Sequence, residues 1–523
     1  MRIHLLLTLL AFLSLTGGAS AQAPKSGGVL TFGVAAEPPT FDCHGGNTFA
    51  VLHAVAPHYS TLLKFDLANY PKIVGDLAES WTVSPDQKTF TFKLHPNVTF
   101  HDGTKLTSAD VKASYERLRR PPTGVLSIRQ ASFSDIESIE APDPTTVVFT
   151  LSQLNAAMLA TFASPWNCIY SAEKLASDPK FPERNILGTG PFKFVEHVKG
   201  SHWTGVRSGG YFRSGLPYLD GYKAVFVSDP SALVNALQGG SIATEFRGLT
   251  PAQRDRLTES LGPQMRVEEM DELVVLLIQF NTEKKPFDDP RVRRALSLAI
   301  DRWNGSPGLA RSSRLKGVGG VMRPGGPFAA PESELVKLPG YGKDPEAARA
   351  EARRLLKEAG QENLTFTLSN RNFSPYTVGG VYAIDQWRRI GVNVEHKQME
   401  TAAWTQAMNS GGYDVIVDFS SDFIDEPSFA LIKYLSFDKS PINVSRAIDR
   451  ELDALYEKQQ RSTDLKSRLE LVRAFEARAL TQAASVPLLW AQRILASRSY
   501  VKGWRMSASN SLGQDLAEVW LDQ

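Results

Sequence analysis

The stretch VVLLIQFNTEKKPFDDPRVRRALSLAIDR, residues 274–302, joins a strand-like run to an amphipathic helix. Its first seven residues are almost all apolar, which is typical of a strand covered on both faces of a sheet. Asp289 can cap a helix and Pro290 can occupy its first turn, and the apolar residues that follow recur at intervals of three and four. We expect 274–280 to be a central strand that crosses between two lobes, with a helix beginning at Pro290.

Strand-like and helix-like segments alternate along the rest of the chain. Asp229-Pro230 and Asp344-Pro345 repeat the same helix start. KTFTFKL at 88–94 alternates polar and apolar residues, as a half-buried strand does, and Thr107 with Asp110 forms a start like a capping box. This alternation predicts an α/β protein.

A second crossing between lobes is predicted near VPLLWAQRILA, residues 486–496, which is again largely apolar. The segment 500–523 is too short to be a domain, so we expect it to return to the first lobe. Residues 304–342 are rich in Gly and Pro and predict a long irregular excursion. Such a loop either borders a binding site or is a solvated decoration.

The first residues predict export. Arg2 and His4 precede an apolar run over 5–15 and then small residues, the pattern of a secretory signal peptide covering 1–23. The run is about half of the ~20 apolar residues that span a bilayer. Cleavage after Ala21 or after Ala23 fits equally, and no cysteine stands there to accept a lipid. We therefore expect an exported protein without a lipid anchor.

The charge balance excludes two classes of partner. The whole chain has a net charge of +2, and removal of the leader leaves 57 Lys plus Arg against 56 acids. A nucleic-acid binder would carry a basic surplus or stripe, and a membrane-surface protein a polybasic run. We expect neither partner.

Cysteines and histidines leave alternatives open. Cys43 and Cys168 can pair in an oxidising compartment, or they can be two buried thiols. Cys43 also lies near His44, His53 and His58, but their spacing matches no known metal site, so structural histidines are the expectation.

Enzyme motifs are missing from the sequence. It contains no GxSxG, HExxH or GxxxxGK[ST] pattern, and nothing in it places two catalytic carboxylates together. We expect no enzyme and no cofactor.

Four stretches together resemble the family 5 extracellular solute-binding proteins, the group with the dipeptide-, oligopeptide- and nickel-binding components of ABC importers. They are GDLAESWTVSPDQKTFTFKLHPNVTFHDGTKLTSADV at 75–111, GTGPFKFVEH at 188–197, PYLDGYKAVFVSDPSALVNALQGG at 217–240 and FNTEKKPFDDPRVRRALSLAIDR at 280–302. The resemblance covers essentially the whole mature chain.

The resemblance implies a type II periplasmic binding protein fold with two α/β lobes, two hinge crossings and a ligand enclosed between the lobes. We assign 24–278 and 492–523 to lobe I, with an extra subdomain at roughly 56–185, and 279–491 to lobe II. The implied partners are a small-molecule ligand, with a peptide as the first expectation, and an ABC importer permease in the inner membrane. We expect a monomer.

The segment SSDFIDEPSF at 420–429 resembles the family's aspartate-aromatic motif. In peptide binders this aspartate pairs with the ligand's terminal ammonium, and Asp422 is the matching position; the alternative is that Asp422 caps a helix or turn. A buried ammonium needs a carboxylate partner. Glu426 stands where a proline is common, so the loop should differ in shape.

Other candidate ligand-binding residues follow from chemistry and position. Arg371, after a strand-like run, could bind a carboxylate in a bidentate way or lie on a solvated face. Trp404, Phe41 and Trp490 could stack on ligand side chains or be core aromatics. Asn281 and Gly190 are expected near the ligand because backbone must approach it closely there.

The identity of the ligand stays open at the level of sequence. The family also holds binders of sugars, opines and nickel chelates, and the same fold could serve a periplasmic sensor or a chaperone-like binder. Around Asn443, INVSRAID replaces the aromatic-containing loop usual in the family.

Overall fold

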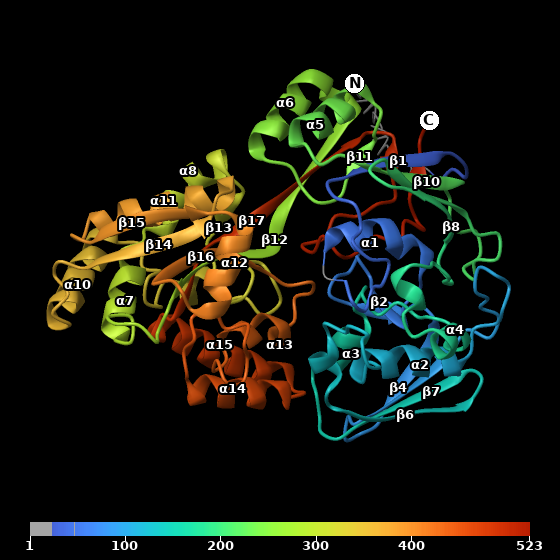
Figure 1. Cartoon of the computed structure of the whole chain (residues 1–523), viewed down its shortest axis with the longest axis horizontal. Coiled ribbons are helices and arrows are strands. Elements are labelled where there is room, and N and C mark those ends of the chain that lie inside the picture. The colour runs from blue at the N-terminus through green and yellow to red at the C-terminus, as the bar shows by residue number, and fades with distance from the viewer. Residues whose placement is uncertain (1–22, 47) are drawn as a thin grey trace, which may run out of the picture.

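The computed structural model describes residues 23–46 and 48–523, so residues 1–22 of the predicted signal peptide lie outside it. Two lobes lie side by side, joined by a two-stranded ribbon (Figure 1). The ribbon consists of β12 (Met265–Phe280) and β17 (Ser485–Arg498), which run antiparallel from one lobe into the other. The two predicted hinge crossings are therefore present.

One sheet continues through both lobes, in the order β15-β14-β16-β12-β17-β11-β1-β10-β9-β8. The second lobe contributes β14 (Thr365–Arg371), β15 (Asn393–Met399) and β16 (Val415–Ser421), and β13 (Leu315–Gly317) joins it on β17. The first lobe contributes β1 (Val29–Val34), β8 (Phe192–Val198), β9 (His202–Arg207), β10 (Gly221–Phe226) and β11 (Thr244–Glu245). The register between β12 and β17 shifts between Asp271 and Val275, where the ribbon passes between the lobes.

The first lobe holds the described parts of both chain ends (Figure 1). Its helices are α1 (Phe49–Val55), α5 (Pro230–Gly239) and α6 (Pro251–Leu261), and the late strands β18 (Val501–Lys502) and β19 (Trp520–Leu521) pair with each other. Cys43 and Cys168 form a disulfide with their Cα atoms 6.0 Å apart. Of the two alternatives for these cysteines, pairing is the one present.

A subdomain extends from the first lobe. It contains the sheet β4 (Ala78–Val83), β5 (Thr89–Leu94), β7 (Thr146–Leu151) and β6 (Ile136–Asp143), with the hairpin β2 (Leu63–Phe65) and β3 (Ile73–Gly75). Its helices are α2 (Ser108–Arg119), α3 (Met158–Phe162) and α4 (Ala172–Ser177). The capping box of Thr107 and Asp110 is confirmed at the start of α2, and the strand predicted at 88–94 is confirmed as β5, which begins at Thr89.

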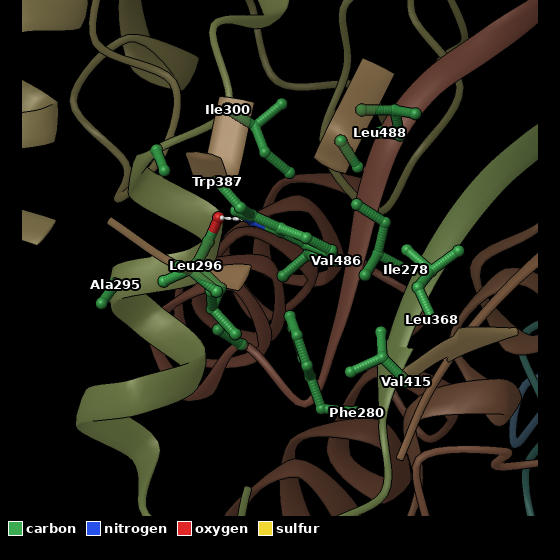
Figure 2. Packing of buried hydrophobic residues seen from close by; sticks show 14 of the residues in the cluster. Ile278, Phe280, Ala295, Leu296, Ile300, Leu368, Trp387, Val415, Val486 and Leu488 are labelled. Atoms are coloured by element: carbon green, nitrogen blue, oxygen red, sulfur yellow. Dashed lines mark hydrogen bonds between the residues drawn. The ribbon is translucent and has the colours of Figure 1, made fainter. Parts of the chain in front are cut away.

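The second lobe packs helices on its part of the sheet. Figure 2 shows Trp387 beside the helix residue Leu296 and above the strand residue Phe280, with its indole Nε1 donating to the Leu296 carbonyl at 2.8 Å. These helices are α7 (Pro290–Leu298), α8 (Arg302–Ser312), α10 (Pro345–Glu358) and α11 (Ser374–Arg388). A separate core forms around α9 (Glu332–Leu335), α13 (Pro427–Ala430), α14 (Arg450–Gln460) and α15 (Leu465–Gln482), and α12 (Thr401–Ser410) completes the lobe.

Residues 304–342 differ from the sequence prediction in their first part. An irregular excursion was expected, but α8 continues to Ser312 with Pro307 inside it. The side chain of Asp301 caps this helix, and Leu309 is buried in the core of the second lobe. Capping and burial together outweigh the low helix propensity of Gly305 and Pro307.

Among the described residues, none of the helices is long and apolar enough to cross a membrane.

Candidate functional site

The candidate site lies where the parallel strands of the second lobe end. Arg371 is the last residue of β14, and Asp422 directly follows β16. In open α/β sheets, ligands bind outside the carboxyl ends of parallel strands. The segment after β16 reaches the first lobe, because Ile424 is buried in the subdomain core and the Asp425 amide donates to the Tyr70 hydroxyl at 2.8 Å. This edge of the sheet is therefore enclosed between the lobes.

Arg371 lies at the centre of a polar and aromatic group. Its Nη2 atom is 2.7 Å from Oδ1 of Asp418, and it also hydrogen-bonds the hydroxyl oxygen of Tyr376. The guanidinium carbon is 4.3 Å from the ring centroid of Tyr376 and 4.9 Å from that of Trp404. Arg371 and Trp404, which were predicted separately as ligand-binding residues, are thus brought together.

Two donors in this group are buried without a partner among the described residues: Nε of Arg371 and the indole Nε1 of Trp404. Leaving a buried donor unsatisfied costs about 1 to 3 kcal/mol. An acceptor group on a ligand would relieve both penalties, and a carboxylate suits the guanidinium best.

Asp418 is the counter-charge of Arg371 on β16. Burial raises the pKa of this carboxyl to about 6, although the guanidinium of Arg371 acts in the opposite direction. The sequence carries a signal for Asp418, since a charged residue interrupts the apolar run of YDVIVDF. That signal was missed.

Asp422 has the predicted position but not a free carboxylate. Its Oδ2 atom is 2.9 Å from Nζ of Lys433, and both side chains are at most one-tenth exposed. An ammonium group of a ligand would therefore have to share this carboxylate with Lys433. Lys433 is a second residue that was missed from the sequence. It lies eleven positions after Asp422, and no local sequence pattern predicts that the two side chains meet across a loop.

Glu426, the departure from the family pattern, is built into the loop. Its side chain accepts from the Ser428 amide at the start of α13 and pairs with Arg468 of α15. The buried ion pair with Arg468 fixes the loop. The residue that caps the helix after β16 is therefore Glu426 and not Asp422.

The lobes also touch at the end remote from the ribbon. Arg461 of the second lobe donates to Oδ2 of Asp135 at 3.1 Å and to the carbonyl of Leu154 at 2.6 Å. The amide of Ala156 donates to the carbonyl of Gln460 at 2.8 Å. A groove of about 830 Å³ between the lobes is lined there by residues of α14 and of the subdomain.

Four other predicted residues have structural partners and do not join the Arg371 group. Phe41 packs edge-on against Trp203, and the Trp490 indole donates to the Gly320 carbonyl. Asn281 donates to the carbonyls of Gly411 and Tyr413, and a Cβ at Gly190 would lie 2.4 Å from the carbonyl carbon of His58. Ligand contacts by these four stay predictions, because each has a sufficient structural reason for its position.

The metal-capable side chains do not converge. Nε2 of His44, Nε2 of His53 and Nδ1 of His58 each contact a different backbone carbonyl, those of Cys168, Asn510 and Phe192. Burial lowers the pKa of all three imidazoles to about 3, so they are neutral. Across residues 23–46 and 48–523, no group of three or more His, Cys, Asp or Glu could hold a metal ion.

Two α/β lobes, two connecting strands and charged groups enclosed at the strand ends define a ligand-binding protein of the two-lobed class. The bacterial extracellular solute-binding protein family 5 model matches residues 72–440. The chain belongs to this family.

Known proteins agree with this assignment. The Di/tripeptide-binding protein 2 of Pseudomonas aeruginosa is 30% identical over 520 residues, covering 92% of this chain and 91% of that protein. A Brucella ovis protein named as an ABC transporter peptide-binding protein is 30% identical over 352 residues, so the match spans 65% of this chain but only 63% of that relative. The ABC transporter substrate-binding protein CtaP of Listeria monocytogenes superimposes with a TM-score of 0.82 at 25% identity, covering 95% of this chain and all of that one.

Proposed function

We propose that this protein is the substrate-binding component of an ABC importer, which captures a peptide between its lobes and delivers it to a permease in the inner membrane. The observation that carries the proposal is the Arg371 group, whose unpartnered Nε and neighbouring Trp404 N–H are suited to a carboxylate. Asp422, at the end of the adjacent strand, suits the ammonium end of the same ligand. The names of the relatives support a peptide.

The remaining parts of the proposal follow from this role. The protein is exported by the leader at 1–23, acts in the periplasm as a monomer and binds its ligand without chemical change. Lobe I comprises 24–278 and 492–523, with the subdomain at roughly 56–185, and lobe II comprises 279–491. The register shift between the pairs Asp271–Gln492 and Val275–Trp490 supports the boundary at 491–492, whereas β12 already pairs with β16 of the second lobe from Val274 onward.

A second candidate ligand is an anionic solute without a primary ammonium group, such as an opine. The observation that favours it is the Asp422 carboxylate, which Lys433 already neutralises. Such a ligand would use the Arg371 group and leave the Asp422–Lys433 pair intact.

Thermal denaturation of the mature protein with di- to pentapeptides tests the proposal. A ligand that binds only the folded state raises the melting temperature with concentration. We expect peptides with free termini to do so and their C-terminal amides to do so much less. If opines raise the melting temperature while no free peptide does, the second candidate is correct and the peptide proposal is wrong.

A further inference from the structure

An arginine of the first lobe, Arg247, lies close to the second lobe. Arg247 lies just after β11, its side chain is open to water, and its guanidinium carbon is 4.0 Å above the ring centroid of Phe49. Within the described chain, its guanidinium makes no hydrogen bond and no ion pair. The backbone is held firmly, because the buried Glu245 carboxylate accepts from the amides of Arg247 and Gly248 at 2.9 and 3.0 Å.

Arg314 of the second lobe lies directly opposite this loop. A Cβ at Gly248 would be 3.0 Å from Nη1 of Arg314, so the loop and the guanidinium are in contact. The same Nη1 atom is 3.1 Å from Oε2 of Glu272, which lies on β12 and is buried. Arg247 and Arg314 therefore approach each other at the ribbon, each from its own lobe.

Tyr376 connects these two arginines with the Arg371 group. Burial raises the pKa of Tyr376 to about 12 and Asp418 adds to the rise, while the charges of Arg371, Arg247 and Arg314 oppose it. The charges of all three arginines therefore act on the Tyr376 hydroxyl. It also hydrogen-bonds Arg371 directly.

The charges of this cluster do not balance. Arg314 pairs with Glu272 and Arg371 pairs with Asp418, but Arg247 has no carboxylate of its own. Burial raises the pKa of the Glu245 carboxylate beneath the loop, and the buried Arg493 opposes this rise by its charge alone, since the Arg493 guanidinium donates to the carbonyls of Phe246, Ser507 and Ser509. Partial removal from water and the neighbouring Arg314 lower the pKa of Arg247, while the carboxylates of Glu272 and Glu245 act in the opposite direction. One anion would neutralise the excess.

We propose that Arg247 and Arg314 form a second anion subsite, which selects peptides that carry an acidic side chain in addition to their terminal carboxylate. This inference rests on the proposed function and specifies its substrate class. The terminal carboxylate occupies the Arg371 group, and the Asp or Glu side chain of the ligand reaches the unpaired guanidinium of Arg247. A charge-assisted hydrogen bond in a partly dehydrated site is strong enough to give roughly a tenfold preference.

Calorimetric titration of the mature protein with matched peptides tests the subsite. The ligands are di- to pentapeptides of alanine in which one residue is Glu or its neutral isostere Gln, and the non-peptide control is glutarate. We expect the best Glu peptide to bind at least about tenfold more tightly than its Gln counterpart. Arg247→Gln should bring the two affinities within about twofold while leaving the affinity for the Gln peptide unchanged.

Arg256→Gln is the matched control, because Arg256 is an exposed arginine on α6 outside the cluster. This control should keep the Glu preference of the wild type. Equal binding of Glu and Gln peptides by the wild type, or an unchanged preference in Arg247→Gln, would overturn the second subsite while leaving the peptide proposal standing. If none of the peptides binds, the proposed function itself is wrong. If glutarate binds and no peptide does, the ligands of this protein are simple dicarboxylates and not acidic peptides.

Discussion

Lys433 holds the carboxylate of Asp422 at 2.9 Å in a setting where both side chains are nearly buried. Two charges that are taken out of water together depend on each other, since removal of one partner leaves the other buried and uncompensated. The residue expected to bind the ammonium of a ligand therefore also has a structural role in the ligand-free protein.

This pair predicts a stability effect that is independent of any ligand. Asp422→Asn should destabilise the protein by about 3 to 5 kcal/mol, because Lys433 then loses its counter-charge. The double variant Asp422→Asn, Lys433→Met should recover a large part of that loss. Urea denaturation of the single and double variants measures both values. An Asp422→Asn variant as stable as the wild type would show that the pair contributes nothing to folding.

Arg461 predicts an effect on the equilibrium between open and closed lobes. Arg461→Ala removes the hydrogen bonds to Asp135 and Leu154 across the outer end of the lobes. The open state should gain population without ligand, and affinity for peptide should fall several-fold because less of the protein is competent to close.

Small-angle scattering of the ligand-free variant checks this prediction as an increase in radius of gyration. Arg450→Ala serves as the control, since Arg450 forms its ion pairs with Asp438 and Asp453 within the second lobe. An equal radius of gyration in wild type and Arg461→Ala would mean that this contact does not restrain the lobes.

The three buried histidines predict loss of stability in mild acid. Their pKa values are lowered from about 6.5 to about 3 by burial, so the unfolded chain binds protons below pH 6.5 that the folded chain does not. The free energy of unfolding therefore falls as pH decreases, by about 1.4 kcal/mol per pH unit for each histidine.

Denaturant titrations between pH 7 and 4.5 measure this slope. His53→Gln should make it shallower by about one histidine's share, because a glutamine in that position does not take up a proton. A pH-independent stability over this interval would contradict neutral burial of His44, His53 and His58.

The disulfide predicts a redox-dependent stability. Cys43 and Cys168 are 125 residues apart, so their bond restricts a long loop of the unfolded chain. Replacement of both by alanine should destabilise the protein by about 2 to 5 kcal/mol. Melting temperatures of the wild type with and without reductant should differ in the same direction, whereas the double variant should not respond to reductant.

Local signals were sufficient for much of the fold. Asp229, Asp289 and Asp344 cap α5, α7 and α10 as expected, because caps and apolar periodicity act within a few residues of the chain. The apolar runs near 274 and 486 likewise lie in β12 and β17. The helix α8 was not predicted, because Gly305 and Pro307 obscure the local cap of Asp301 and the burial of Leu309 in the second-lobe core is a tertiary effect.

The site was only partly predictable because its members meet through tertiary structure. Arg371 and Trp404 were expected, since a strand end and an amphipathic aromatic are general features of binding sites. Arg247 and Arg314 come from different lobes, and no pattern in the sequence places one beside the other. The pairing of Lys433 with Asp422 depends equally on how the loop after β16 folds back.

Native mass spectrometry of the mature wild type and of Arg371→Gln, each mixed with an equimolar set of di- to pentapeptides with free or amidated C-termini, tests peptide capture at Arg371 most directly. We predict that the wild type retains peptides with a free carboxylate in preference to their amides. Arg371→Gln should retain about ten-fold less of the free peptides and should no longer distinguish them from the amides. Equal retention of free and amidated peptides by the wild type, or undiminished retention by Arg371→Gln, would contradict a carboxylate site at Arg371.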